Sequence, residues 1–365
     1  MNSSLTKAFA LLLITLLSSC GGGSSPSPVV NDIQANQLVY GQNTTFSLSG
    51  TLLDQGVVLT SEGCSNLTQG PGAANTSQTW TCQINTAGTG AVTVHAKTAN
   101  GTVLKSQSFD VPPPNYLVIT SIEAGRLMYT KLTAFTINGY SLDKGLTINS
   151  KNCKGLALLA GGTSSKQVIT CTIGAVGKAA VVIDGVLAGG TLVKSKTFDV
   201  PAPQVTMVTN LGTAVVELDA VAAPLSTNNF LQYVTDKFYD NTIFHRIVTS
   251  GIFVAQGGWI TSAPAVQPGQ RSAIALEVGK GLSNVKGTIA MARTAELNSA
   301  TSQFFFNLAD NVALDTASGG YAVFGKIVSG FPLLDALAGV ATSTQYGLTD
   351  FPSQNVVVQS ASQTQ

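Results

Sequence analysis

The sequence predicts a mainly β protein: two tandem β-sandwich repeats followed by a closed β-barrel that two helices cap. Three observations carry this prediction. Cys64 and Cys82 recur as Cys153 and Cys171, at an offset of 89 residues; short apolar–polar alternations are broken by Gly, Asn and Ser; and the pattern changes after residue 203. A chain of 365 residues can hold two or three domains, each with its own core.

Composition narrows the class of protein. Charged residues make up only 10% of the chain, which is typical of β-rich proteins outside the cytoplasm and unlike a cytosolic helical enzyme. The formal net charge of +1 gives no electrostatic reason to expect nucleic acid as a partner. We therefore expect no nucleic-acid binding.

The first residues read as a lipoprotein signal peptide, 1–19, followed by a flexible tether, 20–28. Lys7 precedes an apolar run over 8–17, which is too short to span a bilayer. Leu17-Ser18-Ser19-Cys20 resembles a bacterial lipobox, so Cys20 is the expected lipidation site and the membrane an expected partner. The alternative is an ordinary signal peptide with a chance cysteine. By resemblance to enterobacterial sorting rules, Gly21 after the cysteine favours the outer membrane, on the periplasmic side of the envelope.

Four further cysteines, an even number, suit an oxidising compartment. Zinc is the competing use of four cysteines, but their long spacing and the lack of any Cys-x-x-Cys pair argue against it. The two histidines, His95 and His245, are predicted to lie in different domains, so we expect no metal site. The repeat itself pairs Cys64 with Cys82 and Cys153 with Cys171.

Each repeat, 29–113 and 114–203, is predicted to be an Ig-like β-sandwich. Six or seven alternating runs such as 45–49 and 91–95 fit into one unit, and Phe109-Asp110-Val111-Pro112 recurs as Phe198-Asp199-Val200-Pro201. Neither repeat carries a catalytic constellation. They are interpreted as spacers, with binding to an envelope partner as the alternative.

The third domain is predicted to cover 204–361. Helices are expected to begin at Pro224 and Pro332, each followed by apolar residues at helical spacing. Strand patterns are found at 206–218, around the turn Asn210-Leu211-Gly212, and at 243–244, 252–254, 287–291, 303–306 and 321–324. Many strands with two helices suggest a closed, capped barrel.

Within this domain, Phe238-Tyr239-Asp240-Asn241-Thr242-Ile243-Phe244-His245-Arg246-Ile247 and Gln256-Gly257-Gly258 resemble the first catalytic block of the cyclophilin family of peptidyl-prolyl isomerases. Segments 287–293, 302–305 and 321–325 resemble the remaining blocks. The resemblance covers about 205–358 and implies a cyclophilin-like barrel, proline-containing polypeptides as partners and no cofactor. It implies that Arg246 is the catalytic arginine and that Gln256 orients it. The implied substrate-binding residues are Phe253, Val254, Ala292, Arg293, Gln303, Phe305, Leu314 and Tyr321.

This chemistry needs neither a nucleophile nor a metal. An apolar pocket must hold the proline ring, and a donor such as Arg246 must favour the twisted amide, whose nitrogen regains a lone pair. Phe304 and Phe306 are expected in the core, and His245 is expected to be structural.

Three departures from the family pattern matter. Arg246 and Phe253 are two residues further apart than usual, Ala313 replaces a common bulky aromatic, and Trp259 follows the Gln-Gly-Gly. Ala313 predicts a wider pocket and weak binding of cyclosporin-type inhibitors. The predicted function is isomerisation of Xaa-Pro bonds in exported or envelope proteins. The alternatives are a non-catalytic proline-peptide-binding chaperone and a structural envelope lipoprotein.

Overall fold

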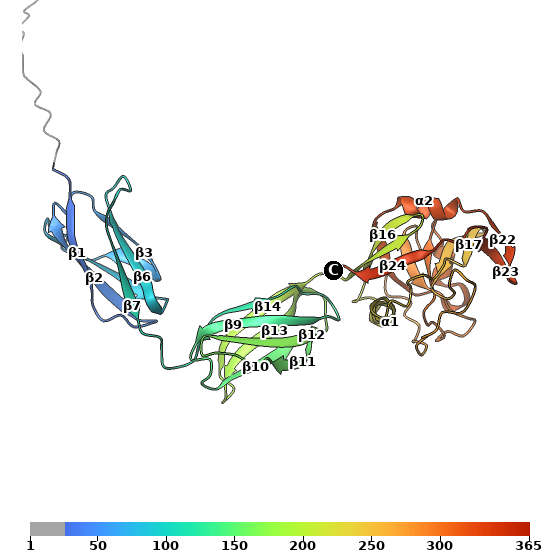
Figure 1. Cartoon of the computed structure of the whole chain (residues 1–365), viewed down its shortest axis with the longest axis horizontal. Coiled ribbons are helices and arrows are strands. Elements are labelled where there is room, and N and C mark those ends of the chain that lie inside the picture. Colours follow the sequence, from blue (N-terminus) through green and yellow to red (C-terminus); the bar gives the residue numbers. More distant parts are fainter. Residues whose placement is uncertain (1–25) are drawn as a thin grey trace, which may run out of the picture. The chain divides into compact units, whose positions relative to one another are not determined.

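The computed structural model describes residues 26–365, so the predicted signal peptide and the predicted lipidation site at Cys20 lie outside the described residues. The chain divides into two compact units, the first ending at Pro114 and the second running from Asn115 to Gln365. The protein is mainly β (Figure 1). Within 26–365, no helix is long and apolar enough to cross a membrane.

The first repeat is built from two antiparallel sheets. One has the strand order β1-β2-β5-β4 and the other β3-β6-β7. Their inward-facing alternate residues form one core, in which Phe46, Leu48 and Val94 are fully buried. The strands are β1 (Val29–Ala35), β2 (Asn43–Thr51), β3 (Val58–Glu62), β4 (Cys64–Gln69), β5 (Ser77–Ile84), β6 (Gly88–Lys97) and β7 (Val103–Val111).

The second repeat reproduces this arrangement, with the orders β8-β9-β12-β11 and β10-β13-β14. Its strands are β8 (Val118–Ala124), β9 (Leu132–Tyr140), β10 (Leu146–Lys151), β11 (Cys153–Leu158), β12 (Lys166–Ile173), β13 (Gly177–Leu187) and β14 (Leu192–Val200). The offset of 89 residues extends to single hydrogen bonds. Lys105 Nζ donates to the Asn31 carbonyl, and Lys194 Nζ donates to that of Thr120, both at 2.6 Å.

The disulfides pair as the repeat predicts. Cys64 bonds to Cys82 and Cys153 to Cys171, with Cα–Cα distances of 5.9 and 5.4 Å. Each bridge joins two neighbouring strands of the same sheet, β4 to β5 and β11 to β12. A closed loop of this length stabilises a domain by roughly 3 kcal/mol in the chain-entropy account.

The C-terminal domain contains one curled eight-stranded sheet with the order β17-β18-β20-β19-β21-β16-β15-β24. Among the described strands, no ladder joins the two outermost ones, so the sheet is a curled half-barrel. An isolated bridge, Ile243 to Val357, and a hydrogen bond from the Asn241 N–H to the Val358 carbonyl at 2.7 Å link the chain beside them. The strands are β15 (Gln204–Thr209), β16 (Gly212–Leu218), β17 (Arg246–Ser250), β18 (Ile252–Gly257), β19 (Thr288–Met291), β20 (Phe304–Asn307), β21 (Val323–Ser329) and β24 (Val358–Gln363).

Both helices begin at the predicted prolines, α1 (Pro224–Thr235) and α2 (Pro332–Ala338). α1 packs against β21 and β24, and α2 packs against β16, β17 and β18 (Figure 1). Phe230 of α1 lies within 5.5 Å of the rings of Tyr239, Phe304 and Phe324, so the helix closes over an aromatic core. Phe304 and Phe306 are fully buried, as expected.

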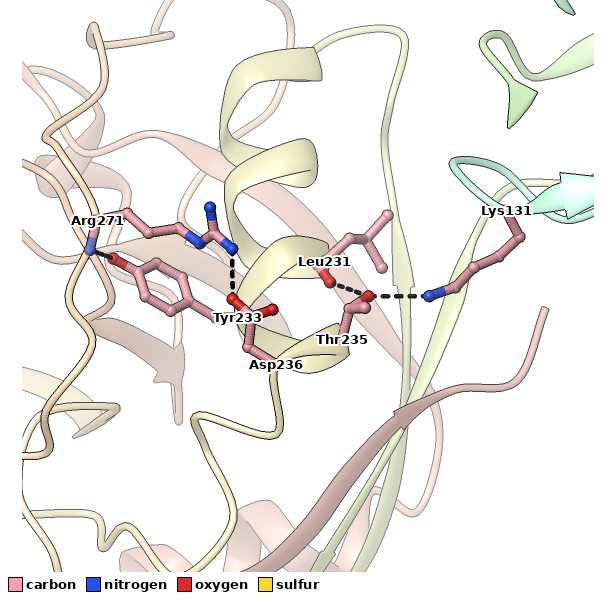
Figure 2. A network of polar contacts seen from close by, with 6 residues as sticks. All are labelled: Lys131, Leu231, Tyr233, Thr235, Asp236 and Arg271. Carbon is pink, nitrogen blue, oxygen red and sulfur yellow. Dashed lines mark hydrogen bonds and ion pairs between the residues drawn. The ribbon is translucent and has the colours of Figure 1, made fainter. Parts of the chain in front are cut away.

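The end of α1 is held by the polar network in Figure 2. Asp236 pairs with the Arg271 guanidinium, and the Tyr233 hydroxyl accepts a hydrogen bond from the Arg271 main-chain N–H at 2.7 Å. Thr235 Oγ1 donates to the Leu231 carbonyl at 2.8 Å and accepts from Lys131 Nζ at 2.8 Å (Figure 2). Burial raises the pKa of Tyr233, so its hydroxyl stays protonated. Lys131 belongs to the second repeat, which is therefore tied to α1.

Two parts of this domain differ from the sequence prediction. Ile243 and Phe244 form no strand: the ladder begins only at Arg246. A second, two-stranded sheet, β22 (Thr342–Gln345) and β23 (Leu348–Pro352), follows α2 and was not foreseen.

Candidate active site

The β17–β18 hairpin places the arginine. Arg246 and Gln256 are partners in its ladder, and Arg246 NH1 donates to Gln256 Oε1 at 3.4 Å. The two additional residues lengthen this hairpin toward its turn at Gly251, where φ is 78°. The Arg–Gln pairing therefore survives the insertion, because the extra residues are absorbed at the far end.

Gln256 is itself held from the other side. Its Nε2 donates to Gln303 Oε1 at 2.8 Å, so one amide joins the arginine to the segment that leads into β20. Gly258, just after Gln256, has φ 83°, and a side chain there would collide with the Ser302 carbonyl. Ser302 Oγ in turn donates to the Gly258 carbonyl at 2.7 Å. The Gln-Gly-Gly motif therefore lets two segments approach closely beside Arg246.

A small cavity of about 110 Å³ opens next to this pair. Apolar and polar side chains both line it: Arg246, Ile252, Val254, Gln256, Ala292, Arg293, Phe305, Leu314 and Tyr321. Phe305 is 4% exposed and packs with its ring edge against Tyr321, the centroids 5.9 Å apart. The structure thus brings together eight of the ten residues proposed from the sequence, with Gln303 adjacent.

Phe253 requires a correction. It does not line the cavity, and its side chain is 38% exposed. Alternate residues of a strand face the same side, and in β18 Ile252, Val254 and Gln256 face the cavity. Phe253 therefore points to the other face, and Ile252 occupies the position expected for it.

Sequence reasoning missed a chain of buried amides behind the cavity. Asn311 accepts a hydrogen bond from the Phe253 N–H at 3.0 Å and donates to the Phe253 carbonyl at 2.8 Å. It also donates to Asn307 Oδ1 at 2.8 Å, and Asn307 donates to Asn284 Oδ1 at 3.1 Å. The last link is Asn284 Nδ2, which donates to Asp315 Oδ1 at 2.8 Å. This network ties β18 to the 3₁₀ turn Val312–Asp315 that carries Leu314.

Hydrogen bonds from Ser283 and Asn284 to the Asp315 carboxylate lower its pKa, outweighing the opposing effect of burial. The carboxylate therefore stays charged near neutral pH and remains an acceptor for Asn284. No local sequence signal marks these residues, because side-chain amides pair only once the strands have been brought together.

The Arg293 side chain is committed to the cavity rim. Its guanidinium donates to the Ser318 and Gly320 carbonyls at 2.6 and 2.8 Å, and it lies 4.6 Å from the centroid of the Tyr321 ring. The Ala292 N–H donates to the Gln303 carbonyl at 3.0 Å. These contacts fix the rim formed by Tyr321 and the turn before it.

His245 is buried and unsuited to act as a base. Its pKa is lowered to about 4, mainly by burial; the Arg246 charge also lowers the pKa, while the Ile243 main chain and the Gln303 side chain raise it. The ring lies 5.2 Å from that of Trp259, edge to face. His245 is therefore neutral at physiological pH and packs behind the site.

Ala313 is exposed and does not line the cavity, so the prediction of weak inhibitor binding stays a prediction.

The profile of the family described as cyclophilin type peptidyl-prolyl cis-trans isomerase/CLD matches residues 204–363. Peptidyl-prolyl cis-trans isomerase A of Dickeya dadantii is 43% identical over 159 residues, which cover 43% of this chain and 82% of that protein. The chain belongs to the cyclophilin family. The cyp18 isomerase of Streptomyces antibioticus is 44% identical over 42% of this chain and 93% of its own length. Isomerase B of Escherichia coli is 38% identical over a match that covers 43% of this chain and 96% of that protein.

The match places the cyclophilin domain after the two repeats, and the site described above lies within it. In the described part of the chain, no three His, Cys, Asp or Glu side chains gather in a way that could hold a metal ion. The groups that the structure gathers at the site are the Arg246 guanidinium, the side-chain amides of Gln256 and Gln303, and the cavity beside them.

Proposed function

We propose that the cyclophilin domain catalyses cis–trans isomerisation of Xaa-Pro bonds in exported or envelope polypeptides. The observation that carries this proposal is the position of Arg246 on the wall of a small cavity with mixed polar and apolar lining, with Gln256 accepting a hydrogen bond from its guanidinium. A proline ring in the cavity would place its nitrogen beside a permanent donor.

The energetics indicate which groups must cooperate. The uncatalysed barrier is about 18–20 kcal/mol because the amide is conjugated. Burying three ring methylenes contributes roughly 2 kcal/mol, and one charge-assisted hydrogen bond about 1.5–3 kcal/mol. A millionfold acceleration needs about 8 kcal/mol, so Arg246 alone is insufficient. The remainder would come from the other preorganised groups of the site, with the bound peptide covering the guanidinium.

The peptide main chain would bind along the rim. The Ala292 N–H is already used by Gln303, which leaves the Ala292 carbonyl and the Arg293 N–H as the main-chain groups to pair with substrate. Gln303 would contribute through Gln256. Phe305, Leu314 and Ile252 would supply the apolar surface that holds the ring.

The test is NMR exchange on a short Ala-Pro-Phe peptide with the full chain. Arg246→Ala removes the donor, while Arg246→Lys keeps the charge but loses the planar fork. We expect fast exchange with the wild type, a loss of one to two orders of magnitude with Arg246→Ala, and partial activity with Arg246→Lys. If the peptide resonances shift but the exchange rate equals the uncatalysed one, the domain is a proline-peptide-binding chaperone and this proposal fails.

We further infer that each repeat is an Ig-like sandwich. The strand orders β1-β2-β5-β4 and β3-β6-β7 correspond to the ABED and CFG sheets of constant-type Ig domains. The disulfides differ from the antibody pattern, since they join neighbouring strands within one sheet instead of bridging the two sheets. The predicted closed barrel would require β17 and β24 to pair beyond the single bridge between Ile243 and Val357.

One difference between the repeats places apolar side chains on the surface. Leu158 and Leu159 are 64% and 45% exposed in the second repeat, where the first has Gln69 and Gly70. This favours partner binding by the second repeat over a pure spacer role. Deleting residues 29–203 behind an intact anchor tests it: an unchanged envelope phenotype would leave the repeats as spacers.

Lipidation of Cys20 and an outer-membrane location on the periplasmic side remain part of the proposal. The support is Lys7, the apolar run over 8–17 and the lipobox-like Leu17-Ser18-Ser19-Cys20. Labelling with a palmitate analogue should mark the wild type and not Cys20→Ser. Equal labelling of both would exclude this anchor.

A further inference from the structure

Arg246 has a second polar neighbour, on the edge opposite Gln256. Asp350 Oδ2 lies 3.9 Å from Arg246 Nε, while Gln256 holds NH1 at 3.4 Å. Among the described residues, Asp350 is the only carboxylate within ion-pair distance of this guanidinium. The two contacts come from different elements, β23 and β18, so together they restrict rotation of the planar group.

The backbone at Asp350 is unusual. Its φ is 55°, in the left-handed region that residues other than Gly rarely adopt and that Asp and Asn tolerate best. The next residue, Phe351, is 1% exposed and packs with Ile243 and Ile260. The buried Phe351 thus anchors β23, and the left-handed turn directly before it holds the Asp350 carboxylate at Arg246.

Trp259 extends the apolar cluster that anchors β23. Trp259 and Leu348 of β23 both pack against Ile243, Ile260 and Phe351, and the Trp259 ring lies edge to face with that of His245. His245 and Arg246 are adjacent in the chain. The tryptophan that departs from the family pattern therefore braces the hairpin that carries Asp350.

We propose that Asp350 is a positioning residue for Arg246: its carboxylate attracts the Nε side while Gln256 holds NH1, so that the guanidinium keeps one orientation beside the cavity. The side chains of the pair are 38% and 40% exposed, so the attraction is screened by water and salt. The proposal rests on the proposed isomerase function and adds to it the element that aims the donor.

The left-handed φ of Asp350 decides which substitutions can test this proposal. Asp350→Asn keeps the tolerance for a left-handed φ but loses the charge, and Asp350→Gly keeps the backbone and removes the side chain. With the full chain, we expect kcat to fall about two- to five-fold in both variants with KM unchanged, which corresponds to the strength of an exposed ion pair. High salt should reduce wild-type kcat toward that of Asp350→Asn, whose own rate should not respond.

A double-mutant cycle separates positioning from a merely structural role of the hairpin. In an Arg246→Ala background, Asp350→Asn should change nothing further, whereas loss of hairpin structure would lower activity in both backgrounds. The Arg246 Nε–H resonance provides a readout that does not depend on turnover. It should shift and exchange faster with water in Asp350→Asn.

Equal kcat, salt response and Nε–H exchange in wild type and Asp350→Asn would overturn the role of Asp350 and leave the isomerase function standing. A faster Asp350→Asn enzyme would also overturn it, because the carboxylate would then be weakening the donor. An inactive wild-type chain would instead remove the proposed function.

Discussion

Arg246 and Gln256 meet twice, as main-chain partners in the β17–β18 ladder and through the side-chain contact from NH1 to Oε1 at 3.4 Å. The strand register places the two main chains opposite each other, and the side-chain contact then orients the guanidinium. Gln256 Nε2 then donates to Gln303 at 2.8 Å. Arg246, Gln256 and Gln303 therefore form a chain of hydrogen-bonded side chains that ends at the arginine.

Gln256 should matter more than Gln303. Gln256→Leu removes the acceptor for NH1, and a hydrogen bond to a charged group is worth about 1.5–3 kcal/mol, so kcat/KM should fall about ten- to hundred-fold. Gln303→Leu acts only through Gln256 and should cost a few-fold. Proline exchange rates measured on one peptide compare the two. A larger loss for Gln303→Leu would mean that Gln303 meets the substrate directly.

Ile252 and Phe253 form a matched pair for testing which face of β18 holds proline. Ile252→Ala removes apolar surface from the cavity and should lower kcat/KM about five-fold, from roughly 1 kcal/mol of lost contact. Phe253→Ala should stay within two-fold of wild type, since its side chain is off the cavity and Asn311 holds its main chain. The reverse ranking would restore Phe253 to the pocket and contradict the register described here.

Local and repetitive features were predictable from the sequence. The offset of 89 residues predicted the duplicated unit and its disulfide pairing, and the prolines at 224 and 332 marked both helix starts. In the site, the motifs predicted Arg246 and Gln256, because few residue types can donate to a prolyl nitrogen and orient that donor. The choice of Phe253 failed because adjacent strand residues cannot both face one cavity, and an insertion hides which of them does.

Other parts depend on contacts that no local pattern encodes. β22 and β23 are short and largely polar, and their one strong anchor is Phe351, which packs on residues about 90 and 110 positions earlier. Asn311 looks like an ordinary loop residue until β18 lies beside it. Such groups acquire their roles only from tertiary structure.

Asn311 should be a stability residue of the cyclophilin domain. Asn311→Ala removes three hydrogen bonds and leaves the Phe253 N–H without its acceptor, so unfolding should become about 2–4 kcal/mol easier. The chain has two tryptophans, so Trp259 fluorescence in a Trp80→Phe background follows this domain in urea. Asn298, which is exposed and accepts one hydrogen bond from the Leu276 N–H, is the control: Asn298→Ala should cost under 1 kcal/mol. Equal effects would mean that the amide chain contributes nothing beyond a surface contact.

The pH dependence should separate catalysis from stability. Arginine side chains as a class do not titrate near neutral pH, and the pKa of His245 is lowered to about 4, so the mechanism involves no group that changes charge between pH 6 and 8. The chemical step should therefore be nearly flat across that range. A bell or a slope centred near 6.5 would indicate a titrating histidine and contradict the mechanism.

Stability should instead fall in acid because of His245. Its folded pKa of about 4 lies below the unfolded value of 6.5, so the unfolded chain binds the extra proton first. The stability that comes from neutral His245 is complete above about pH 6.5 and is lost progressively as the pH falls to 4, by about 3 kcal/mol in all. Urea titrations followed by Trp259 fluorescence at several pH values measure this slope. His245→Gln, which cannot titrate, should lose that part of the slope, and an unchanged slope would assign the acid sensitivity to other groups.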